Sequence, residues 1–440
     1  VAKMLENTQS ILCAFCLAAS APRSLYRHLE LCGIAWTELI PMLRSFPNPM
    51  KKFIALVLTL ALAVSLCACS DKPAGQTASF TVPMDDSTYT YTAPTDANGE
   101  TVTLPGGSVI ALAAEQTSLD NGADALLWKG IQTFASSFGY TAESHPAADS
   151  SVEAAEAALR EAAESGAALV VCRGEAMAQA MFNIQNNYPG VHYLLFDGEP
   201  HNDTYTSYTS ASNVHCVLFQ EEQAGYLAGY AAVTEGHTQL GFIGADEVPG
   251  IVRYVTGFMQ GAEYAAEQQG LTVNLRTWFT GTYQAGDETT NRMLDWCNNG
   301  TTLLFVSGGN LVASAIDAAN ETTSENTVRV LAADYDQTGL SDVMLGSAIK
   351  CYSSAVQQEL YEFFSGNATW GQAAAGQSEK VGYTTGAVAL AGPYWRYEQL
   401  SQRDYERLYE QLRNSVLKVD SYADMRTLPD TPSVTIDQQN

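Results

Sequence analysis

Charged residues stand at the ends of short apolar runs that are typical of buried strands. Asp334 closes the run VRVLAAD and is followed by Asp336, and Lys350 closes the segment SAIK. A carboxylate accepts two hydrogen bonds at once, which suits the vicinal hydroxyls of a sugar. The alternatives are an aspartate that only caps its loop and a lysine that only forms an ion pair with Asp334 or Asp336.

Glycines and further charges follow other runs of the same kind. Gly308 and Gly309 come after TLLFVS, where glycine lets backbone N–H groups approach a ligand closely, although a simple turn has the same requirement. Arg173 and Glu175 follow ALVVC, and Asp197 follows HYLLF. These three residues either line a binding cleft or are ordinary loop charges.

The sequence lacks the motifs of common catalytic sites. It holds no G-x-S-x-G, H-E-x-x-H or Walker motif, and no G-x-G-x-x-G after a strand. Its six histidines lack metal-ligand spacing, and we expect His192 and His215 to be core residues. We therefore predict no catalytic residues, no cofactor and no metal. An enzyme that turns over a small-molecule ligand is the alternative.

The composition is that of a large, acidic and foldable chain. Its 440 residues exceed what one hydrophobic core usually holds, so more than one domain is expected. The net charge of −26 would repel nucleic acid. Hydrophobic residues make up 46% and charged residues 16%, which excludes wholesale disorder. Buried free thiols are expected at Cys172, Cys216, Cys297 and Cys351, although the sequence leaves a disulfide open.

A secretory signal is predicted at residues 50–68. The apolar run FIALVLTLALAVSL follows Met50 and two lysines and is shorter than a membrane-spanning helix. The signal and its cut site end in LCAC (66–69), which resembles the lipobox of bacterial lipoproteins. That resemblance implies lipidation of Cys69; an uncleaved anchor and a plain secretory signal are the alternatives.

The segments on either side of the signal are interpreted separately. Residues 1–49 show little periodicity and are interpreted as a non-native upstream extension, with Met50 as the true start. Residues 69–107 are rich in Thr, Ser, Asp, Pro and Gly and predict a flexible tether.

After the tether, β-rich runs alternate with amphipathic stretches. Strands are expected at 109–114, 168–172, 192–196, 214–219, 240–244, 273–279, 302–306 and 328–334. Helices are expected at 153–164, 250–270 and 401–418. This alternation predicts parallel sheets with helices on both faces, and the length favours two lobes. Ligands of such sheets bind at the carboxyl ends of the strands, so we expect a cleft between the lobes.

Four blocks are similar to one known family. FQEEQAGYLAGYAAV (219–233), LGFIGADEVPGIVRYVTGFMQGA (240–262), VLAADYDQ (330–337) and SAIKCYSSAV (347–356) resemble, in order and spacing, the basic membrane protein family of bacterial lipoproteins. Its members are substrate-binding components of ABC transporters, and the characterised ones bind purine nucleosides. The resemblance implies the type I periplasmic-binding-protein fold, which is α/β with two doubly wound lobes joined by a three-strand hinge.

The resemblance also implies domain limits and partners. It implies a first lobe of 105–218 plus 345–378 and a second of 219–344 plus 379–440. The protein would be a lipid-anchored monomer on the extracytoplasmic face of the bacterial cell membrane. It would pass its ligand to an ABC permease and, through that permease, serve the ATPase. A sensory lipoprotein for a membrane receptor, or a receptor for a non-nucleoside such as a sugar, are the alternatives. The signal and the acidic charge exclude a repressor of the same fold.

The ligand-binding residues are likewise implied by the resemblance. Asp334 would contact the ribose, with Asp336 beside it, and Lys350 would donate to the ligand from across the hinge. Gly309 would line the site. Phe305 lies one residue from a family position whose ring stacks on the base, although a phenylalanine in a strand is usually a core residue.

The N-terminal binding loop departs from the family pattern. Asp120, Asp124 and Trp128 fall in register, but Ala123 replaces the stacking phenylalanine. Losing that ring removes about 0.5–1.5 kcal/mol of stacking. Either the ligand differs, or another ring such as Trp128 or Tyr283 takes over.

Overall fold

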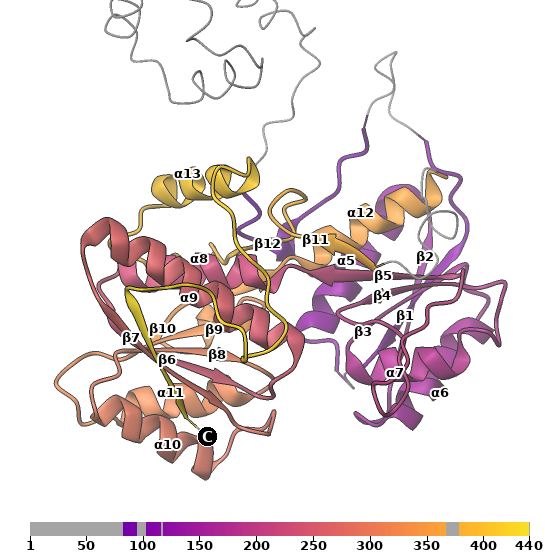
Figure 1. Cartoon of the computed structure of the whole chain (residues 1–440). Helices are drawn as coiled ribbons and strands as arrows, with labels where there is room; N and C mark the ends of the chain where they lie inside the picture. The colour runs from indigo at the N-terminus through magenta and orange to yellow at the C-terminus, as the bar shows by residue number, and fades with distance from the viewer. Residues whose placement is uncertain (1–81, 95–102, 116–117, 367–377, 440) are drawn as a thin grey trace, which may run out of the picture. The chain divides into compact units, whose positions relative to one another are not determined.

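The structure is a computed structural model that describes residues 82–94, 103–115, 118–366 and 378–439 (Figure 1). The predicted signal, Cys69 and the upstream extension lie outside these residues. From Thr81 onward the chain forms one compact unit, which contains two sheets. No helix in the described ranges is both long enough and apolar enough to cross a membrane.

The first lobe is built on a six-stranded parallel sheet in the order β11-β5-β4-β3-β1-β2. The strands are β1 (Val109–Ala114), β2 (Thr141–Pro146), β3 (Leu169–Arg173), β4 (His192–Phe196), β5 (Val214–Phe219) and β11 (Ser378–Val381). The helices are α5 (Ala123–Phe138), α6 (Val152–Glu164), α7 (Glu175–Ile184) and α12 (Tyr352–Phe364). Because α5 packs on α12 and α6 packs on α7, each face of this sheet has its own helix pair.

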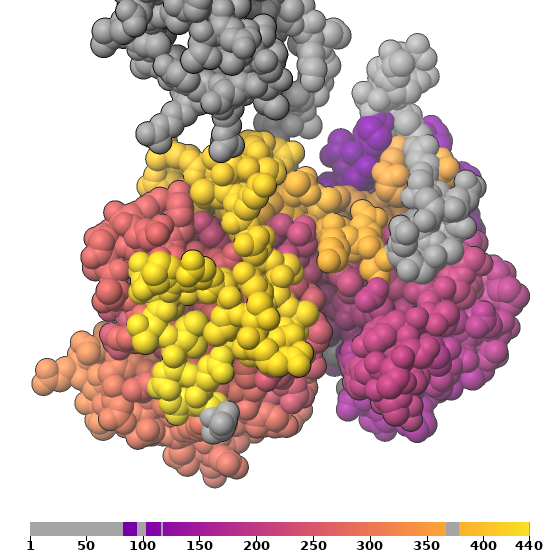
Figure 2. Space-filling view, in the orientation of Figure 1, coloured from indigo at the N-terminus to yellow at the C-terminus, as the bar shows by residue number. Residues whose placement is uncertain are grey.

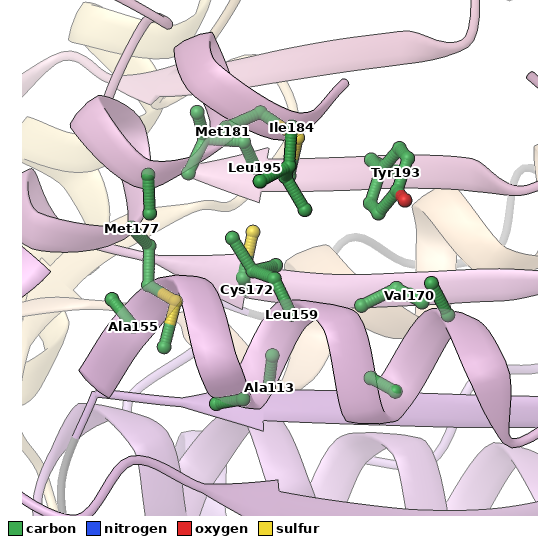
Figure 3. Packing of buried hydrophobic residues seen from close by; sticks show 14 of the residues in the cluster. Ala113, Ala155, Leu159, Val170, Cys172, Met177, Met181, Ile184, Tyr193 and Leu195 are labelled. Carbon is green, nitrogen blue, oxygen red and sulfur yellow. The ribbon is translucent and has the colours of Figure 1, made fainter. Parts of the chain in front are cut away.

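The core of this lobe explains why the strand ends are held firmly. Leu159 of α6 and Met177 and Met181 of α7 pack over Cys172 and Leu195 of the sheet, as Figure 3 shows. All five side chains are fully buried, and the alanines of α6 let that helix lie close to the strands. Such close packing leaves the loops after the strands little freedom to shift.

The second lobe has a seven-stranded sheet in the order β12-β10-β9-β8-β6-β7-β13, in which only β12 is antiparallel. The strands are β6 (Gln239–Gly244), β7 (Val273–Phe279), β8 (Leu303–Ser307), β9 (Arg329–Asp334), β10 (Met344–Lys350), β12 (Val388–Leu390) and β13 (Val434–Gln439). The helices are α8 (Glu221–Thr234), α9 (Pro249–Gln269), α10 (Asp287–Asn298), α11 (Leu311–Glu321) and α13 (Gln402–Arg413), and short 3-10 turns lie at Asp86–Thr88 (η2) and Thr338–Leu340 (η3). The pairs α8–α9 and α10–α11 pack together.

Helices α8 and α9 touch through their backbones. A Cβ atom on Gly225 or Gly229 of α8 would overlap a carbonyl oxygen of α9, and one on Gly257 or Gly261 of α9 would overlap a carbonyl oxygen of α8. Glycine is required at such a close approach. The pairing fixes the first turn of α8, which carries Glu221, beside α9.

Three chain crossings join the lobes, and they are hydrogen-bonded to one another. The chain crosses after β5, after β10 and between β11 and β12. The N–H of Gln220 donates to the carbonyl of Val381 at 2.9 Å, and the N–H of Cys351 donates to the carbonyl of Ala387 at 2.8 Å. The crossings therefore form a ladder rather than three independent linkers.

The structure moves two of the expected boundaries. Strand β10 pairs with β9 in the second sheet, so the second crossing lies at its end and not before 345 as expected. Strand β11 pairs with β5 in the first sheet, which extends the first lobe beyond 378. In both cases the backbone pairing of a strand, which the sequence does not reveal, decides the lobe.

Other differences concern helix ends and an edge strand. The expected helix 401–418 begins after Ser401, whose Oγ accepts from the N–H of Asp404 at 3.1 Å, but it ends at Arg413. Ser415 lies in the left-handed region with φ 57°, which stops the helix. Strand β2 was not expected, because it is an edge strand without alternating apolar residues.

The last part of the expected tether is packed against the lobes. Val82 and Asp86 are buried. The carboxylate of Asp86 accepts from the N–H groups of Ser353 and Ser354 at 2.7 and 2.8 Å, so it caps α12 from a distant part of the chain. The N–H of Gly392, in lobe two, donates to the carbonyl of Met84 at 2.7 Å. Residues 82–88 therefore contact both sides of the hinge.

We predict that Asp86 makes stability depend on pH. Burial raises the pKa of Asp86 from 3.8 to about 6, although the two N–H donors oppose the rise. Because the folded pKa is the higher one, this contribution is complete below the unfolded pKa and is lost as the pH rises through about 6. Between pH 4.5 and 7.5, the free energy of unfolding of the wild type should fall by about 2 kcal/mol relative to that of Asp86→Asn. Urea unfolding at each pH measures it. Parallel pH profiles of the two proteins would contradict this.

Candidate functional site

Charged groups from both lobes meet around the buried ammonium of Lys350. This residue ends β10, and its Nζ lies 3.0 Å from Asp197 Oδ1, 3.0 Å from Glu221 Oε1 and 3.2 Å from Asp334 Oδ1. Asp197 follows β4 of the first lobe, Glu221 begins α8, and Asp334 ends β9. An ammonium has three donor hydrogens, so these carboxylates can use all of them.

The mutual attraction of these groups outweighs the cost of burial. Burial alone would lower the pKa of Lys350, but Asp197 and the other negative partners hold this pKa well above its ordinary value. Burial alone would raise the pKa of Asp197, but Lys350 and Arg173 lower it. Lys350 and Asp197 therefore stay charged at neutral pH.

The two aspartates occupy equivalent places in the two lobes. Asp197 follows the fourth strand of the first sheet, and Asp334 ends the fourth strand of the second. Both have left-handed backbones, with φ 57° and 74°, which aspartate tolerates better than most residues. Tyr352 donates a hydrogen bond to Asp197, and Tyr254 O–H lies 3.4 Å from Asp334 Oδ1 and accepts from its N–H at 3.2 Å. Such backbones persist where surrounding contacts hold them, often at functional sites.

A second ionic network lies at the strand ends of the first lobe. Arg173 Nε contacts Asp124 Oδ1 at 2.8 Å, and its Nη2 lies 3.9 Å from Glu115 Oε2. Glu115 also accepts from the N–H of Ala176 in the first turn of α7 at 3.2 Å. Gly174 lies beside the Glu115 carboxylate with φ +93°, a backbone conformation that favours glycine. Asp124, one of the expected ligand contacts, is thus fully buried and orients Arg173.

Three expected residues of the second lobe lie in different settings. The ring of Phe305 is fully buried between Phe242 and Phe258, with centroid distances of 5.5 and 5.0 Å, so it packs in the core and presents no face to a ligand. Asp336 Oδ1 accepts from the N–H of Thr338 at 2.9 Å and caps the following turn. Gly309 has φ +50°, and a Cβ there would overlap the carbonyl of Tyr283.

Most residues of the expected N-terminal binding loop lie away from the ion pairs of Arg173. Asp120 is exposed and accepts from the hydroxyl of Ser118 at 2.8 Å. Trp128 is half-buried within α5, and Ala123 is buried as its first residue. Of this loop, only Asp124 joins the charged groups at the strand ends.

Each lobe has an exposed tyrosine near the carboxylates of Glu175 and Asp246. Tyr205 is 56% exposed and stacks on the ring of His201 at 4.5 Å, and His201 Nε2 lies 2.9 Å from Glu175 Oε1. In the second lobe, Tyr283 is 42% exposed. The pKa of Tyr283 is raised to about 12 by partial burial and then by the charges of Asp246 and Glu175, which belong to different lobes. Figure 2 shows a furrow between the first lobe (magenta) and the second (salmon to yellow).

Several partners of Lys350 carry little or no recognisable signal in the sequence. Glu221 and Tyr352 begin the helices that follow the first two crossings. Asp197 follows an apolar run, and Tyr254 lies within α9. Their common signal is position, because each lies at a strand end or on a helix that packs on the crossings.

Comparison with known proteins identifies the family. Residues 108–421 match the family model described as ABC transporter substrate-binding protein PnrA-like (Bmp). The chain belongs to this family. It is therefore a solute-binding component of an ABC transporter, and its family consists of binding proteins rather than enzymes. No curated protein matches the sequence.

Solved structures show the same fold at low identity. A solute-binding protein of an ABC transporter from Aeropyrum pernix K1 is 16% identical, with a TM-score of 0.56 over 73% of this chain and 95% of its own. One from Conexibacter woesei is 16% identical, with 0.55 over 72% and 100%. A transcriptional activator of the comK gene from Bacillus halodurans is 18% identical, with 0.54 over 70% and 97%. The expected two-lobed α/β fold of type I periplasmic-binding proteins is confirmed.

We predict that Lys350→Met strongly destabilises the protein. Removing the ammonium leaves three carboxylates close together and without their shared cation, which typically costs about 3–5 kcal/mol. Urea unfolding measures the loss. Lys380→Met, at an exposed lysine of β11, is the matched control and should change stability by less than about 0.5 kcal/mol. Equal stability of the two variants would show that the network contributes little.

Proposed function

We propose that this binding protein captures a nucleoside, with a purine nucleoside favoured, between its two lobes. The observation that carries the proposal is the position of Asp334. Among the three carboxylates around Lys350, its side chain is 32% exposed, whereas those of Asp197 and Glu221 are 11% and 4% exposed. Asp334 is thus the carboxylate most available to accept hydrogen bonds from the vicinal hydroxyls of a ribose.

Lys350 and the lobe-one groups would hold the rest of the ligand. The ammonium already contacts both lobes, so a ligand polar group that reaches it would be bound from both sides of the hinge. Arg173 would line the first-lobe wall, and the buried Asp124 would orient it. Contacts from both lobes favour the closed state, because a ligand shifts an opening equilibrium only through its differential affinity for the two states.

Exposed tyrosines are the proposed replacement for the missing phenylalanine at Ala123. Tyr283 of lobe two and Tyr205 of lobe one are exposed. A carboxylate of the opposite lobe helps to raise the pKa of each. A ring from either would stack on a nucleobase with about 0.5–1.5 kcal/mol beyond its buried area. Aromatic stacking in this protein would then come from residues other than those of the family loop.

The proposed cellular setting follows from the signal sequence. Lipidation at Cys69 would hold the protein on the extracytoplasmic face of the membrane, where it would deliver its ligand to an ABC permease. The segment after Cys69 would supply reach, while residues 82–88 are already packed on the lobes.

We predict that Asp334→Asn weakens binding of inosine, guanosine or adenosine at least tenfold, because the amide replaces one acceptor by a donor. Isothermal titration measures the affinities. The matching 2′,3′-dideoxynucleoside lacks the hydroxyls, so wild type and variant should bind it almost equally. Asp342→Asn, at an exposed aspartate before β10, is the control variant. An equal loss with both ligands would assign Asp334 a role through Lys350 alone.

A thermal-shift screen tests the ligand class itself. Nucleosides, free bases, sugars and amino acids are compared, because a ligand of the folded state raises the unfolding midpoint by mass action. A response to sugars or amino acids without one to nucleosides would overturn the nucleoside proposal and leave the family assignment intact.

We predict that Cys69→Ala abolishes lipidation. A diacyl anchor contributes about 0.8 kcal/mol for each buried CH₂, so the wild type should partition into the detergent-rich phase of a Triton X-114 extract. Intact mass and phase partitioning measure the change. Cys67→Ala removes a neighbouring thiol and should leave lipidation unchanged. An unmodified wild-type protein, cleaved elsewhere, would favour the plain secretory signal.

A further inference from the structure

A second group of metal-ligating side chains lies at the edge of the first sheet. His215 is the second residue of β5, Glu379 is the second residue of the neighbouring edge strand β11, and Glu359 lies on α12, which covers this part of the sheet. His215 and Glu359 are buried, and Glu379 is exposed. All three belong to the first lobe, toward the amino ends of the strands, whereas the ligand-binding groups lie at the carboxyl ends.

One ring nitrogen of His215 lies close to both carboxylates, as it would around a shared cation. One ring nitrogen, His215 Nε2, lies 3.5 Å from Glu359 Oε2 and 3.3 Å from Glu379 Oε2. N–H···O hydrogen bonds usually measure about 2.7–3.2 Å. In a tetrahedral zinc site with bonds of about 2.0–2.1 Å, neighbouring ligand atoms are about 3.3 Å apart. The three ligand atoms lie within 4.8 Å of one another.

The chemistry of the group also favours a divalent cation. One imidazole nitrogen and two carboxylate oxygens form a common set of three protein ligands for Zn²⁺, which leaves a fourth position for water. A protonated imidazole would offset one of the two negative charges, whereas a divalent ion offsets both. The exposed side of Glu379, at 48%, gives an ion and its water a path from solvent.

We propose that His215, Glu359 and Glu379 bind a divalent transition-metal ion, with Zn²⁺ as the preferred ion. The site would fasten the short edge strand β11 to β5 and α12. Since β11 leads directly into the third crossing, the ion would stiffen the first-lobe side of the hinge. The absence of histidine spacing motifs in the sequence is no obstacle, because the three ligands come from elements far apart in the chain.

The test compares zinc binding by the purified protein and two variants. After treatment with EDTA and desalting, the protein is titrated with Zn²⁺, and bound metal is measured by atomic emission together with the thermal unfolding midpoint. The wild type should retain one equivalent of zinc and unfold at a higher temperature with it. Glu379→Gln, at an exposed side chain, should bind zinc at least tenfold more weakly while folding normally, and His215→Gln should do the same.

Glu143→Gln is the matched control. His145 also has two glutamates nearby, but Glu143 lies 3.9 Å from its Nε2 and Glu161 lies 3.7 Å from its Nδ1, so the two carboxylates face different ring nitrogens. This control should bind zinc like the wild type. The proposal is overturned if the wild type retains no more zinc than Glu379→Gln, or if Glu143→Gln loses as much. Neither result depends on the nucleoside ligand.

Discussion

The arrangement of the two lobes depends on the ion pairs of the buried Lys350 ammonium. A cation at this depth is costly unless oxygen atoms surround it, and the chain supplies three carboxylates from three elements. Each needs its own support. Tyr352 and Tyr254 contact the two aspartates, and the glycine contacts between α8 and α9 hold the first turn of α8, from which Glu221 extends. Asp197 and Asp334 both place a carboxylate against Lys350 Nζ, and their left-handed backbones are the conformational cost of that placement.

In the proposed binding mode, the network around Lys350 limits how a ligand can bind. Lys350 contacts carboxylates of both lobes, so a ligand group that approaches the ammonium must replace a carboxylate or bind beside one. Asp334 is the exposed member and therefore the one that can exchange its partner most cheaply. An exchange of this kind changes the free energy little, since one charge-assisted hydrogen bond replaces another. The affinity would then come mostly from the groups that meet only when the lobes close, including the exposed tyrosines.

The sequence predicts the alternation of strands and helices better than it predicts which side chains are in contact. Apolar runs indicated β1, β4, β5 and β7 with the bounds that the structure has. Edge strand β2 was missed because it lacks a buried face. Phe305 shows a different limit, since a motif one residue out of register cannot distinguish a ring in the core from a ring that faces a ligand. Side-chain partners such as Arg173 with Asp124, or His215 with Glu359, depend on packing between distant segments and leave no local pattern.

The near-symmetry of the lobes explains why one lysine suffices. In chain order, β5 and β10 are the fifth strands of their sheets, and each ends where the chain crosses to the other lobe. The residue in the place of Lys350 on β5 is Phe219, whose ring centroid lies 5.7 Å from the ammonium. A second lysine there would place two cations among the same carboxylates, whereas an aromatic face adds a weak attraction for the first. Strands β5 and β10 therefore end in residues of different character, and the single cation Lys350 is shared by Asp197, Glu221 and Asp334.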